Sequence, residues 1–503
     1  MKLLKLIFFL IILSNSTYAI TWYVTPTGSG TQDGSSWANA APGNVLQTII
    51  NASISGDEVW VSCGTFTTTS TTNRNISFSM KNGVAIYGSF IGTETSLSQR
   101  VFSCGPCSIL TGEIGIVGNS DNSYHIVNNP IGLNNTAIID GFAVQDANDN
   151  RTATTTNGLG GGFYNNGAGS GNICNPTIRN CVIRNNSAQF GGGILNNGYS
   201  DGNSSPIITN CIITNNTAYL GGGGLDNFGL NGMASPTMTN CIIYSNNALQ
   251  SAGGMFCWGG NNGNANPNII NCVFANNTAV DGGGIVSSRE NSPSGSFSGN
   301  SNPIIFNSVF WGNTASSVGP QFFLIGGATF NATYSDINLT GQTTPHLVTG
   351  SATGNLNTTP LFVNIMNALG IDNCWLTDDD GLQLQNSSPL INSGNLTDAP
   401  IQDILGNSRT GNPDIGAYEY SIPLSIENNQ INYFNIYPNP TSDELTIQFS
   451  DNLNHVIQIY DMYGKLVFFK IISKIEILNL YNLSNGIYII KIDDRQNKKL
   501  IKK

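Results

Sequence analysis

The chain has 503 residues, with 19 Lys and Arg against 30 Asp and Glu, which gives a formal net charge of −11. So acidic a chain repels phosphate backbones, and we therefore expect no nucleic-acid partner. Its 58 glycines and many short β-type runs, with a helix pattern in one short segment, favour an all-β protein with many turns.

Residues 1–19 have the features of a secretory signal peptide. Lys2 and Lys5 precede an apolar run over 6–13, and Thr17 and Ala19 place small residues at the cleavage site, so we predict cleavage after Ala19. The run is too short to span a bilayer, and no other transmembrane candidate follows. We expect an exported protein without a transmembrane span.

Residues 44–53 carry a helical pattern. Val45, Leu46, Ile49 and Ile50 fall on one face of a short helix. Such a helix can cover the open first layer of a stacked structure and protect its strand edge, so we predict an N-terminal cap.

Three cysteines lie near the N-terminus, outside any repeat. Cys104 and Cys107 are separated by Gly-Pro, and Cys63 precedes them. In an exported protein such residues can hold a loop disulfide. A zinc site is the alternative, although a second ligand pair is lacking.

Two weak catalytic candidates lie close together and a third follows. Asp121 and His125 are four residues apart, and Asp140 comes later. A His near an Asp can transfer protons. The alternative is that His125 lies in a strand and bonds to a neighbouring carbonyl.

Two acidic loops are candidates for calcium, the one metal cofactor considered. Asp146 and Asp149 lie in the first, and Asp378 and Asp380 in the second. Carboxylate oxygens suit Ca²⁺, but neither loop has EF-hand spacing or a closing glutamate. Acidic turns without metal remain the alternative.

A repeat of about 30 residues dominates residues 175–315. Pro176, Pro206, Pro236 and Pro267 are spaced by 30, 30 and 31 residues, and Pro303 opens a degraded fifth copy. A fixed period of this length, with short strands and corners, predicts a right-handed parallel β-helix whose coils lie ~4.8 Å apart. We expect three strands in each coil.

Cysteines and asparagines recur at fixed offsets within the repeat. The column five residues after each proline is Cys181, Cys211, Cys241, Cys272 and Ser308, each preceded by Asn. We expect the cysteines to form a single buried file and the asparagines to adopt left-handed corners. Five residues further on, Asn186, Asn216, Asn246, Asn277 and Asn313 predict a ladder of stacked amides.

One column of the repeat is a candidate ligand-binding surface. Twenty-two residues after successive prolines stand Gly198, Phe228, Trp258 and Arg289. If these side chains face outward, two aromatic rings and a guanidinium form a stacking platform for sugars. If they face inward, they are core.

The regular coils lack an obvious catalytic set. No lysine occurs between Lys81 and Lys465, and the acids of residues 175–286 share no column, whereas glycosidases need paired carboxylates. We expect Arg179 and Arg184 to point into solvent. With 10 Lys and Arg against 22 Asp and Glu in residues 1–420, uronic-acid polymers are poor partners unless metal bridges them.

The composition changes after residue 420. Residues 421–503 carry 9 Lys and Arg against 8 Asp and Glu, so we place a linker at 421–432 and a separate domain at 433–503. Leu445, Ile447 and Phe449 alternate with polar residues between turn signals, which predicts a small β-sandwich.

The body, residues 20–420, resembles bacterial pectin-lyase-like β-helix surface proteins, sometimes called choice-of-anchor proteins. The likeness lies in the opening Trp22-Tyr23-Val24-Thr25-Pro26 and the closing Ser388-Pro389-Leu390-Ile391-Asn392 and Asp414-Ile415-Gly416-Ala417-Tyr418. The Gly-Gly-Gly-Ile repeats also resemble those of chlamydial polymorphic membrane proteins, which are adhesins.

The tail resembles the type A C-terminal sorting domain of the type IX secretion system of Bacteroidota. The residues that carry the likeness include Pro438, Asn439, Pro440, Asp461, Gly464, Lys465, Gly486, Tyr488 and Lys502. The resemblance implies that the secretion machinery is a partner, that the tail is removed, and that the body is held at the outer cell surface.

These observations favour a secreted, surface-attached adhesin or glycan-binding module without catalysis. Its partners would be glycans or the surfaces of host or neighbouring cells. The alternative is a polysaccharide lyase or glycoside hydrolase that acts through loops outside the repeat.

Overall fold

The computed structural model describes residues 19–100, 102–118, 120–152, 158–289, 298–342, 353–420, 434–449, 454–493 and 496–503. The predicted signal peptide before Ala19 and the predicted linker 421–432 lie outside these ranges. The chain forms two units, Met1–Ser421 and Ile422–Lys503, which are described separately.

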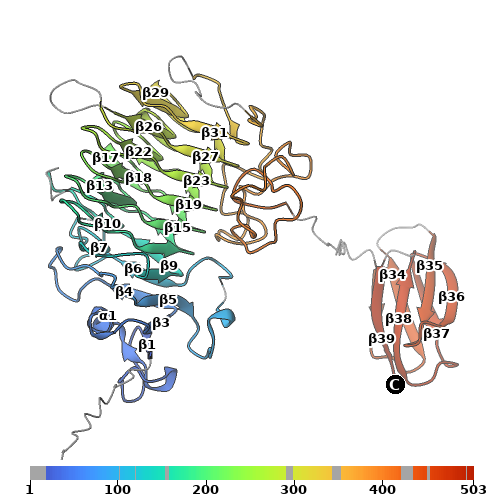
Figure 1. Cartoon of the computed structure of the whole chain (residues 1–503). Helices are drawn as coiled ribbons and strands as arrows, with labels where there is room; N and C mark the ends of the chain where they lie inside the picture. Colours follow the sequence, from blue (N-terminus) through green and yellow to red (C-terminus); the bar gives the residue numbers. More distant parts are fainter. Residues whose placement is uncertain are drawn as a thin grey trace, which may run out of the picture. The chain divides into compact units, whose positions relative to one another are not determined.

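The first unit is a right-handed parallel β-helix, as predicted (Figure 1). Each regular coil contributes one strand to each of four parallel sheets, and each strand pairs in register with the equivalent strand of the next coil. The four-strand coil differs from the three-strand expectation. The Thr-Ala segment after the second corner, such as Thr217–Gly221, is itself a strand.

The 11-stranded sheet has the order β2 (Ala41–Pro42), β1 (Thr21–Thr25), β3 (Glu58–Ser62), β5 (Ala85–Phe90), β8 (Ile138–Asp140), β11 (Thr177–Arg179), β15 (Ile207–Thr209), β19 (Thr237–Thr239), β23 (Asn268–Ile270), β27 (Ile304–Phe306), β31 (Asn331–Thr333). The nine-stranded sheet has the order β32 (Asp336–Ile337), β28 (Val309–Trp311), β24 (Val273–Ala275), β20 (Ile242–Tyr244), β16 (Ile212–Thr214), β12 (Val182–Arg184), β9 (Phe142–Gln145), β6 (Ser108–Thr111), β4 (Gly64–Thr67).

The seven-stranded sheet has the order β30 (Phe322–Ile325), β26 (Ile285–Ser288), β22 (Met255–Trp258), β18 (Leu225–Phe228), β14 (Ile194–Asn197), β10 (Phe163–Asn166), β7 (Val127–Asn129). The five-stranded sheet has the order β13 (Ser187–Phe190), β17 (Thr217–Gly221), β21 (Asn247–Ala248), β25 (Thr278–Asp281), β29 (Thr314–Val318).

The cysteine column lies in single file inside the helix, as predicted. Arg179 pairs with Thr209 and Val182 with Ile212, so Cys181 is in register with Cys211. Cys181, Cys211, Cys241 and Cys272 are free, and each is at most 1% exposed. Burial raises the pKa of the Cys211 and Cys272 thiols, so they stay neutral and pack as small apolar groups.

The two asparagine columns have the roles that the sequence predicts, left-handed corners and a ladder of stacked amides. Asn180, Asn210 and Asn240 have φ of 52°, 52° and 50°, the left-handed region that a corner needs. In the ladder ten residues after each proline, Asn186 donates through both its backbone N and its Nδ2 to Oδ1 of Asn216, at 3.1 and 3.0 Å. The same bonds repeat from coil to coil as far as Asn313.

The predicted cap is present. Helix α1 (Leu46–Ala52) buries Leu46, Ile49 and Ile50 against the first coils. Three short 3₁₀ turns, η1 (Trp37–Asn39), η2 (Gly43–Val45) and η3 (Leu97–Gln99), complete the N-terminal end.

The coils end at β32, and residues 353–420 form what we call the strap, which has no regular strand or helix. It runs along the outer face of the nine-stranded sheet (Figure 1). The sheet contributes Val182, Ile212, Ile242, Val273 and Val309 to this contact, and the strap contributes Phe362, Trp375, Leu382, Leu384, Leu390, Ile404, Ile415 and Tyr418. Burial of each such side chain is worth roughly 1.5–3 kcal/mol, so the strap is part of the fold.

Hydrogen bonds hold the strap to the coils at several heights. Tyr244 donates to the carbonyl of Ile365 at 3.0 Å, and Asn307 donates to that of Asn395 at 2.8 Å. The Arg409 guanidinium donates to Asn240 Oδ1 at 3.2 Å and is paired with Glu419 at 2.9 Å.

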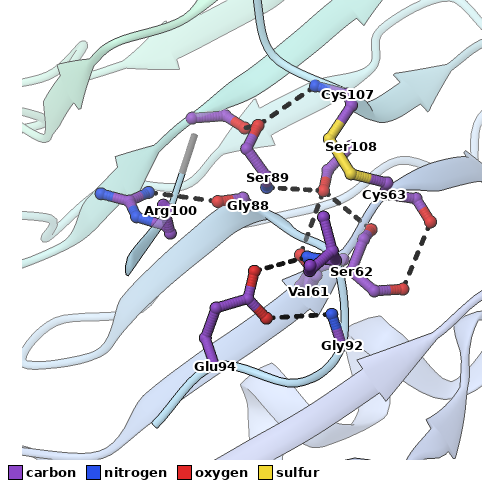
Figure 2. Close-up of a disulfide and its surroundings, with 12 residues drawn as sticks. Val61, Ser62, Cys63, Gly88, Ser89, Gly92, Glu94, Arg100, Cys107 and Ser108 are labelled. Atoms are coloured by element: carbon purple, nitrogen blue, oxygen red, sulfur yellow. Dashed lines mark hydrogen bonds between the residues drawn. A yellow bond between two sulfur atoms is a disulfide. The ribbon is translucent and has the colours of Figure 1, made fainter. Parts of the chain in front are cut away.

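Two disulfides tie the N-terminal part of the helix together. Cys63 bonds to Cys107, within the predicted trio, beside a network in which the Ser89 hydroxyl accepts from Cys107 N at 3.1 Å (Figure 2). Cys104 bonds to Cys374 of the strap, 270 residues away. The sequence analysis did not predict this partner for Cys104, because no local pattern in the sequence indicates that the strap returns to the first coils.

The second unit is a β-sandwich, as predicted. One sheet has the order β33 (Phe434–Tyr437), β34 (Glu444–Phe449), β37 (Ile475–Asn479), and the other has β36 (Leu466–Ser473), β35 (Asn454–Tyr460), β38 (Gly486–Ile492), β39 (Gln496–Lys502). Leu445, Ile447 and Phe449 point inward and are at most 4% exposed.

Candidate functional site

The structure separates the three weak catalytic candidates. Asp140 lies in β8 and is buried between two guanidiniums, at 3.1 Å from Arg100 and 2.5 Å from Arg179. Asn180 donates to the same carboxylate at 2.9 Å. Asp140 is therefore a neutralised structural group. Arg179 pairs with it instead of pointing freely into solvent, which corrects the expectation for that arginine.

Asp121 and His125 lie near one another in the chain but have different roles. The Asp121 carboxylate accepts from the backbone N of Ile116 at 2.9 Å and so shapes its loop. His125 bonds through Nδ1 to the carbonyl of Gly160 at 2.6 Å, the carbonyl contact of the alternative interpretation, although His125 lies before β7 and not in a strand. Its Nε2 lies 3.1 Å from Arg151 Nη2.

His125 belongs to a compact group that we call the histidine cluster, which consists of Arg74, Tyr124, His125, Asp149 and Arg151. Arg151 is held by Asp149, with contacts of 2.7 and 2.8 Å, and lies over the Tyr124 ring at 3.9 Å from its centroid. Arg74 lies over the same ring at 4.2 Å. Two guanidiniums, a phenol and an imidazole thus meet at one place.

The electrostatics of the cluster keep the imidazole neutral. Burial lowers the pKa of His125, and the nearby Arg151 cation acts in the same direction, against the Gly160 bond and Asp149. A neutral imidazole at neutral pH can accept a proton. Its side chain is 8% exposed and that of Arg151 is 23% exposed, so the guanidinium is the outer of the two groups.

The seven-stranded sheet runs on from this cluster. His125 stacks on Tyr164 of β10 with ring centroids 5.6 Å apart. Along the outer face of the sheet, Tyr164 is in register with Leu195, Leu195 with Asp226, and Asp226 with Phe256. This row starts at the cluster and follows the helix axis for roughly 14 Å, at ~4.8 Å per strand.

The structure places two of the three residues of the predicted binding column in register, and their role in binding stays a prediction. Phe228 is in register with Trp258, and both are half-buried on the outer face. Their register partners are Asn197 and Ser288, not Gly198 and Arg289. The preceding strand of the five-stranded sheet has one residue fewer in the coils after Pro176 and Pro267. Ala188 is in register with Ala218 but Phe190 with Gly221, so a constant offset fails there.

Arg289 therefore lies outside the column, and its guanidinium bonds to backbone carbonyls of neighbouring loops. Its Nε donates to the carbonyl of Gly299 at 2.7 Å and its Nη1 to that of Gly327 at 3.2 Å.

The aromatic residues gather into what we call the aromatic patch, which consists of Tyr199, Phe228, Phe256 and Trp258. The ring centroids of Phe228 and Trp258 are 5.2 Å apart, those of Tyr199 and Phe228 5.7 Å, and those of Phe256 and Trp258 6.1 Å. Rings on two successive strands and on the turn after β14 offer flat apolar faces of the kind on which sugar rings stack.

Asp226, beneath the patch, is a residue that sequence reasoning passed over. It is 1% exposed between Leu195 and Phe256, and its Oδ1 has no hydrogen-bond partner among the described residues. Burial raises its pKa well above the usual range and so favours the protonated form of the carboxyl group. The signal in the sequence is its isolation, a single acid in a row of large apolar side chains.

The acidic loops do not assemble a metal centre among the described residues, where no group of three His, Cys, Asp or Glu side chains comes together. Asp146 accepts from Gln145 at 2.7 Å, Asp149 holds Arg151, and Asp380 accepts from Tyr418 at 2.6 Å. Asp378 is exposed. Calcium binding stays a prediction.

The sorting-motif residues build turns and edges of the second unit. Asn439 donates to the carbonyl of Lys499 at 2.7 Å and accepts from Ile501 N at 2.9 Å. Asp461 accepts from Lys465 N at 3.0 Å across a turn in which Gly464 has a φ of 80°. Tyr488 donates to the carbonyl of Ser484 at 2.7 Å, and Lys502 pairs with Asp443 at 2.9 Å.

Fold and tail together define an exported β-helix protein. Residues 435–503 match the family model described as secretion system C-terminal sorting domain. The chain thus carries a type IX sorting domain, which addresses it to the cell surface or the outside of the cell and implies contact with the secretion machinery. Among the described residues, no helix is long and apolar enough to cross a membrane.

Two curated relatives share part of the chain. It is 36% identical over 80 residues to ulvan lyase NLR42 of Nonlabens ulvanivorans and 35% identical over 85 residues to an endo-acting ulvan lyase of Formosa agariphila. The chain spans 15% and 16% of the length of these relatives. The shared stretch is about as long as the C-terminal unit, and it leaves most of the β-helix unmatched.

Among solved structures, a protein named 1,3-α-1,4-β-D-galactose-4-sulfate-3,6-anhydro-D-galactose-2-sulfate 4 galactohydrolase is 16% identical. The alignment covers 54% of this chain and 61% of that chain, with a TM-score of 0.24. A likeness this weak carries no argument about activity.

Proposed function

We propose that the protein degrades an acidic polysaccharide outside the cell, with the glycan lying along the seven-stranded sheet and its cleavage occurring at the histidine cluster. The observation that carries this proposal is the position of Arg151, which contacts the His125 imidazole and the Tyr124 ring while remaining partly exposed. The names of the two relatives, both lyases, add support.

The chemistry that fits this set is β-elimination at a uronic acid. A guanidinium that binds the carboxylate of the sugar makes the proton on the neighbouring carbon more acidic. A base removes that proton, a carbon–carbon double bond forms, the glycosidic carbon–oxygen bond breaks, and the leaving oxygen takes up a proton. Arg151 and Arg74 would bind the carboxylate, neutral His125 would take the proton, and the Tyr124 phenol would give one.

The net negative charge of the body argues against an acidic polysaccharide as substrate, but the two guanidiniums of the histidine cluster offset this charge locally. Asp149, the acid that contacts Arg151, is already paired with it. A sugar carboxylate that contacts Arg151 Nη2 would compete with His125 for this group and so release the imidazole lone pair.

A second candidate is glycan binding without cleavage. It is favoured by the burial of His125, whose two ring nitrogens both have protein partners, and by the aromatic patch, which needs no catalytic group to hold a sugar.

A cleavage assay decides between them. The purified protein is incubated with ulvan and other uronic-acid polysaccharides, and the unsaturated products are followed by their ultraviolet absorbance. We expect product from the wild-type protein and a loss of about 10²- to 10⁴-fold in His125→Gln, the usual contribution of general acid–base catalysis. Arg289→Gln, which removes a guanidinium outside the cluster, should retain activity.

The outcomes separate the two functions. Equal activity of His125→Gln and the wild-type protein would refute the role of the cluster. Binding of the polysaccharide without any product would favour the second candidate.

A further inference from the structure

A recess lies between the strap and the nine-stranded sheet, close to the disulfide of the strap. This recess, which we call the strap recess, has a volume of about 180 Å³. The coils line it with Ala143, Val182 and Arg184, the loop before β6 with Cys104, Gly105 and Pro106, and the strap with Leu369, Asn373, Cys374 and Trp375. The Cys104–Cys374 disulfide joins the loop wall to the strap wall.

The recess has one charged wall. Arg184 was expected to point into solvent, but it is half-buried and lines this space. Its Nε donates to Gln145 Oε1 at 2.9 Å, and Gln145 in turn donates to Asp146 at 2.7 Å. These bonds fix the guanidinium, and its two terminal nitrogens have no acceptor among the described residues.

Among the residues that the structure describes, no acidic side chain lines the recess, so none of these walls neutralises Arg184. The acid nearest in sequence to the strap wall, Asp372, is exposed and accepts from the backbone N of Cys374 at 2.8 Å. A half-buried cation with unused donors selects an anion, and the flat guanidinium suits a carboxylate or a sulfate.

The remaining walls suit a carbon skeleton. Val182, Leu369, Pro106 and the 5% exposed Trp375 are apolar, and Asn373 adds an amide. At ~30 Å³ per water molecule the volume equals about six waters, below the ~300 Å³ at which pockets for larger ligands begin. One sugar ring with an acidic substituent is of this size.

We propose that the strap recess binds a single acidic sugar unit, a uronic acid or a sulfated monosaccharide, through Arg184 with Trp375 as the apolar wall. The preference for an anion stands on the recess alone. The choice of a sugar rests on the proposed function, because a protein that cleaves acidic polysaccharides meets such units as products and as chain ends.

Calorimetry on the purified full-length protein tests the proposal. D-glucuronate is the probe and D-glucose is its neutral control. An oligosaccharide that ends in glucuronate distinguishes binding of free sugar units from binding of chain ends. We expect glucuronate to bind at least tenfold more tightly than glucose. Arg184→Gln should lose at least tenfold in affinity, Arg184→Lys should lose less, and Arg289→Gln should be unchanged.

A second measurement guards against a variant that folds poorly. Trp375 lies in the wall, so glucuronate should change the tryptophan fluorescence of the wild-type protein, and this change should disappear in Trp375→Phe while the far-ultraviolet circular dichroism stays the same. Equal affinities for glucuronate and glucose, or full affinity in Arg184→Gln, would overturn the proposal.

Cleavage is measured in parallel, so the two proposals fail separately. Arg184→Gln should still cleave polysaccharide if the histidine cluster is the active site. A protein that binds glucuronate at Arg184 and cleaves nothing would keep the recess and refute the proposed activity.

Discussion

Two outer faces of the same coils differ in what covers them. On the nine-stranded sheet one outward row is aliphatic, with residues such as Ile212 and Ile242, and the strap covers these residues to 0% exposure. On the seven-stranded sheet the outward residues include the aromatic Phe228 and Trp258, which stay half-buried. The chain covers its aliphatic row and leaves open the rings that can stack on a ligand, which teaches that an apolar outer row is by itself no sign of a binding site.

The largest effect should follow from removal of the cover. Deletion of residues 353–420 would expose the aliphatic row and leave Cys104 without its partner. We expect aggregated or unfolded protein, measured by the soluble yield and circular dichroism. Cys104→Ala with Cys374→Ala is the milder control, which should fold and lose roughly 2–4 kcal/mol of unfolding free energy. A soluble, cooperatively folding deletion variant would contradict the role of the strap.

Next in size is a matched pair of truncations on the two faces. Ile242→Ala leaves a cavity beneath the strap and should cost roughly 2–4 kcal/mol of unfolding free energy. Phe228→Ala removes a larger side chain, yet one that is already half in water, and should cost about 1 kcal/mol. Urea unfolding of both variants measures the difference. Equal costs would show that the open face is as much core as the covered one.

A pH effect should mark the covered face. Burial raises the pKa of Asp380, which accepts a bond from Tyr418, from 3.8 to about 7. The folded state then keeps a proton that the unfolded chain has already lost, so the contribution of this group to stability falls as pH rises from about 4 to about 7.

Asp380→Asn should remove this part of the pH dependence, which amounts to roughly 3–4 kcal/mol over the window at about 1.4 kcal/mol per pKa unit. Melting temperatures of variant and wild type measured across it provide the check, and parallel curves would refute the assignment. The comparison with wild type is needed because Asp336 titrates in the same pH window, since burial raises its pKa to about 6.

The smallest effect on stability should accompany a clear effect on binding. Trp258→Ala removes the half-exposed ring of the aromatic patch and should cost less than about 1 kcal/mol of unfolding free energy, while weakening glycan binding by roughly tenfold, the value of one stacking contact. Affinity electrophoresis in polysaccharide gels measures this, with Tyr219→Ala, an exposed ring on β17 of the five-stranded sheet, as the control. Unchanged mobility would remove the patch from the binding surface.

The repeat made the coils predictable because each column repeats one physical role. Cys211 and Asn216 stand at fixed offsets from a proline, and their neighbours above and below are the same residues, so burial and ladder bonds follow. The fourth strand was missed because only Ala218 and Gly221 of the segment Thr217–Gly221 are buried, so the segment lacks the run of large apolar residues that marks the other strands.

The candidate site was less predictable because it depends on contacts between loops that the period does not describe. His125 and Asp121 are four residues apart but do not meet, whereas Arg151 reaches both His125 and Tyr124 from another loop. The sequence put Phe228 and Trp258 in one column correctly, but a one-residue difference within the preceding strand put Arg289 into it wrongly. Asp226 was discounted because it shared no column with another acid. A single acid among large apolar residues is nevertheless the pattern that singles it out.

The strap also limits how this protein can grow. Within the strap, Cys374 is bonded to Cys104 beside the first coils, and Asn395 is bonded to Asn307 beside the last coils. A duplicated thirty-residue unit between these points would lengthen the rod by ~4.8 Å and pull the strap out of step with its anchors. The length of the strap therefore restricts the number of coils between its two attachment points, while the sequence of those coils can still change.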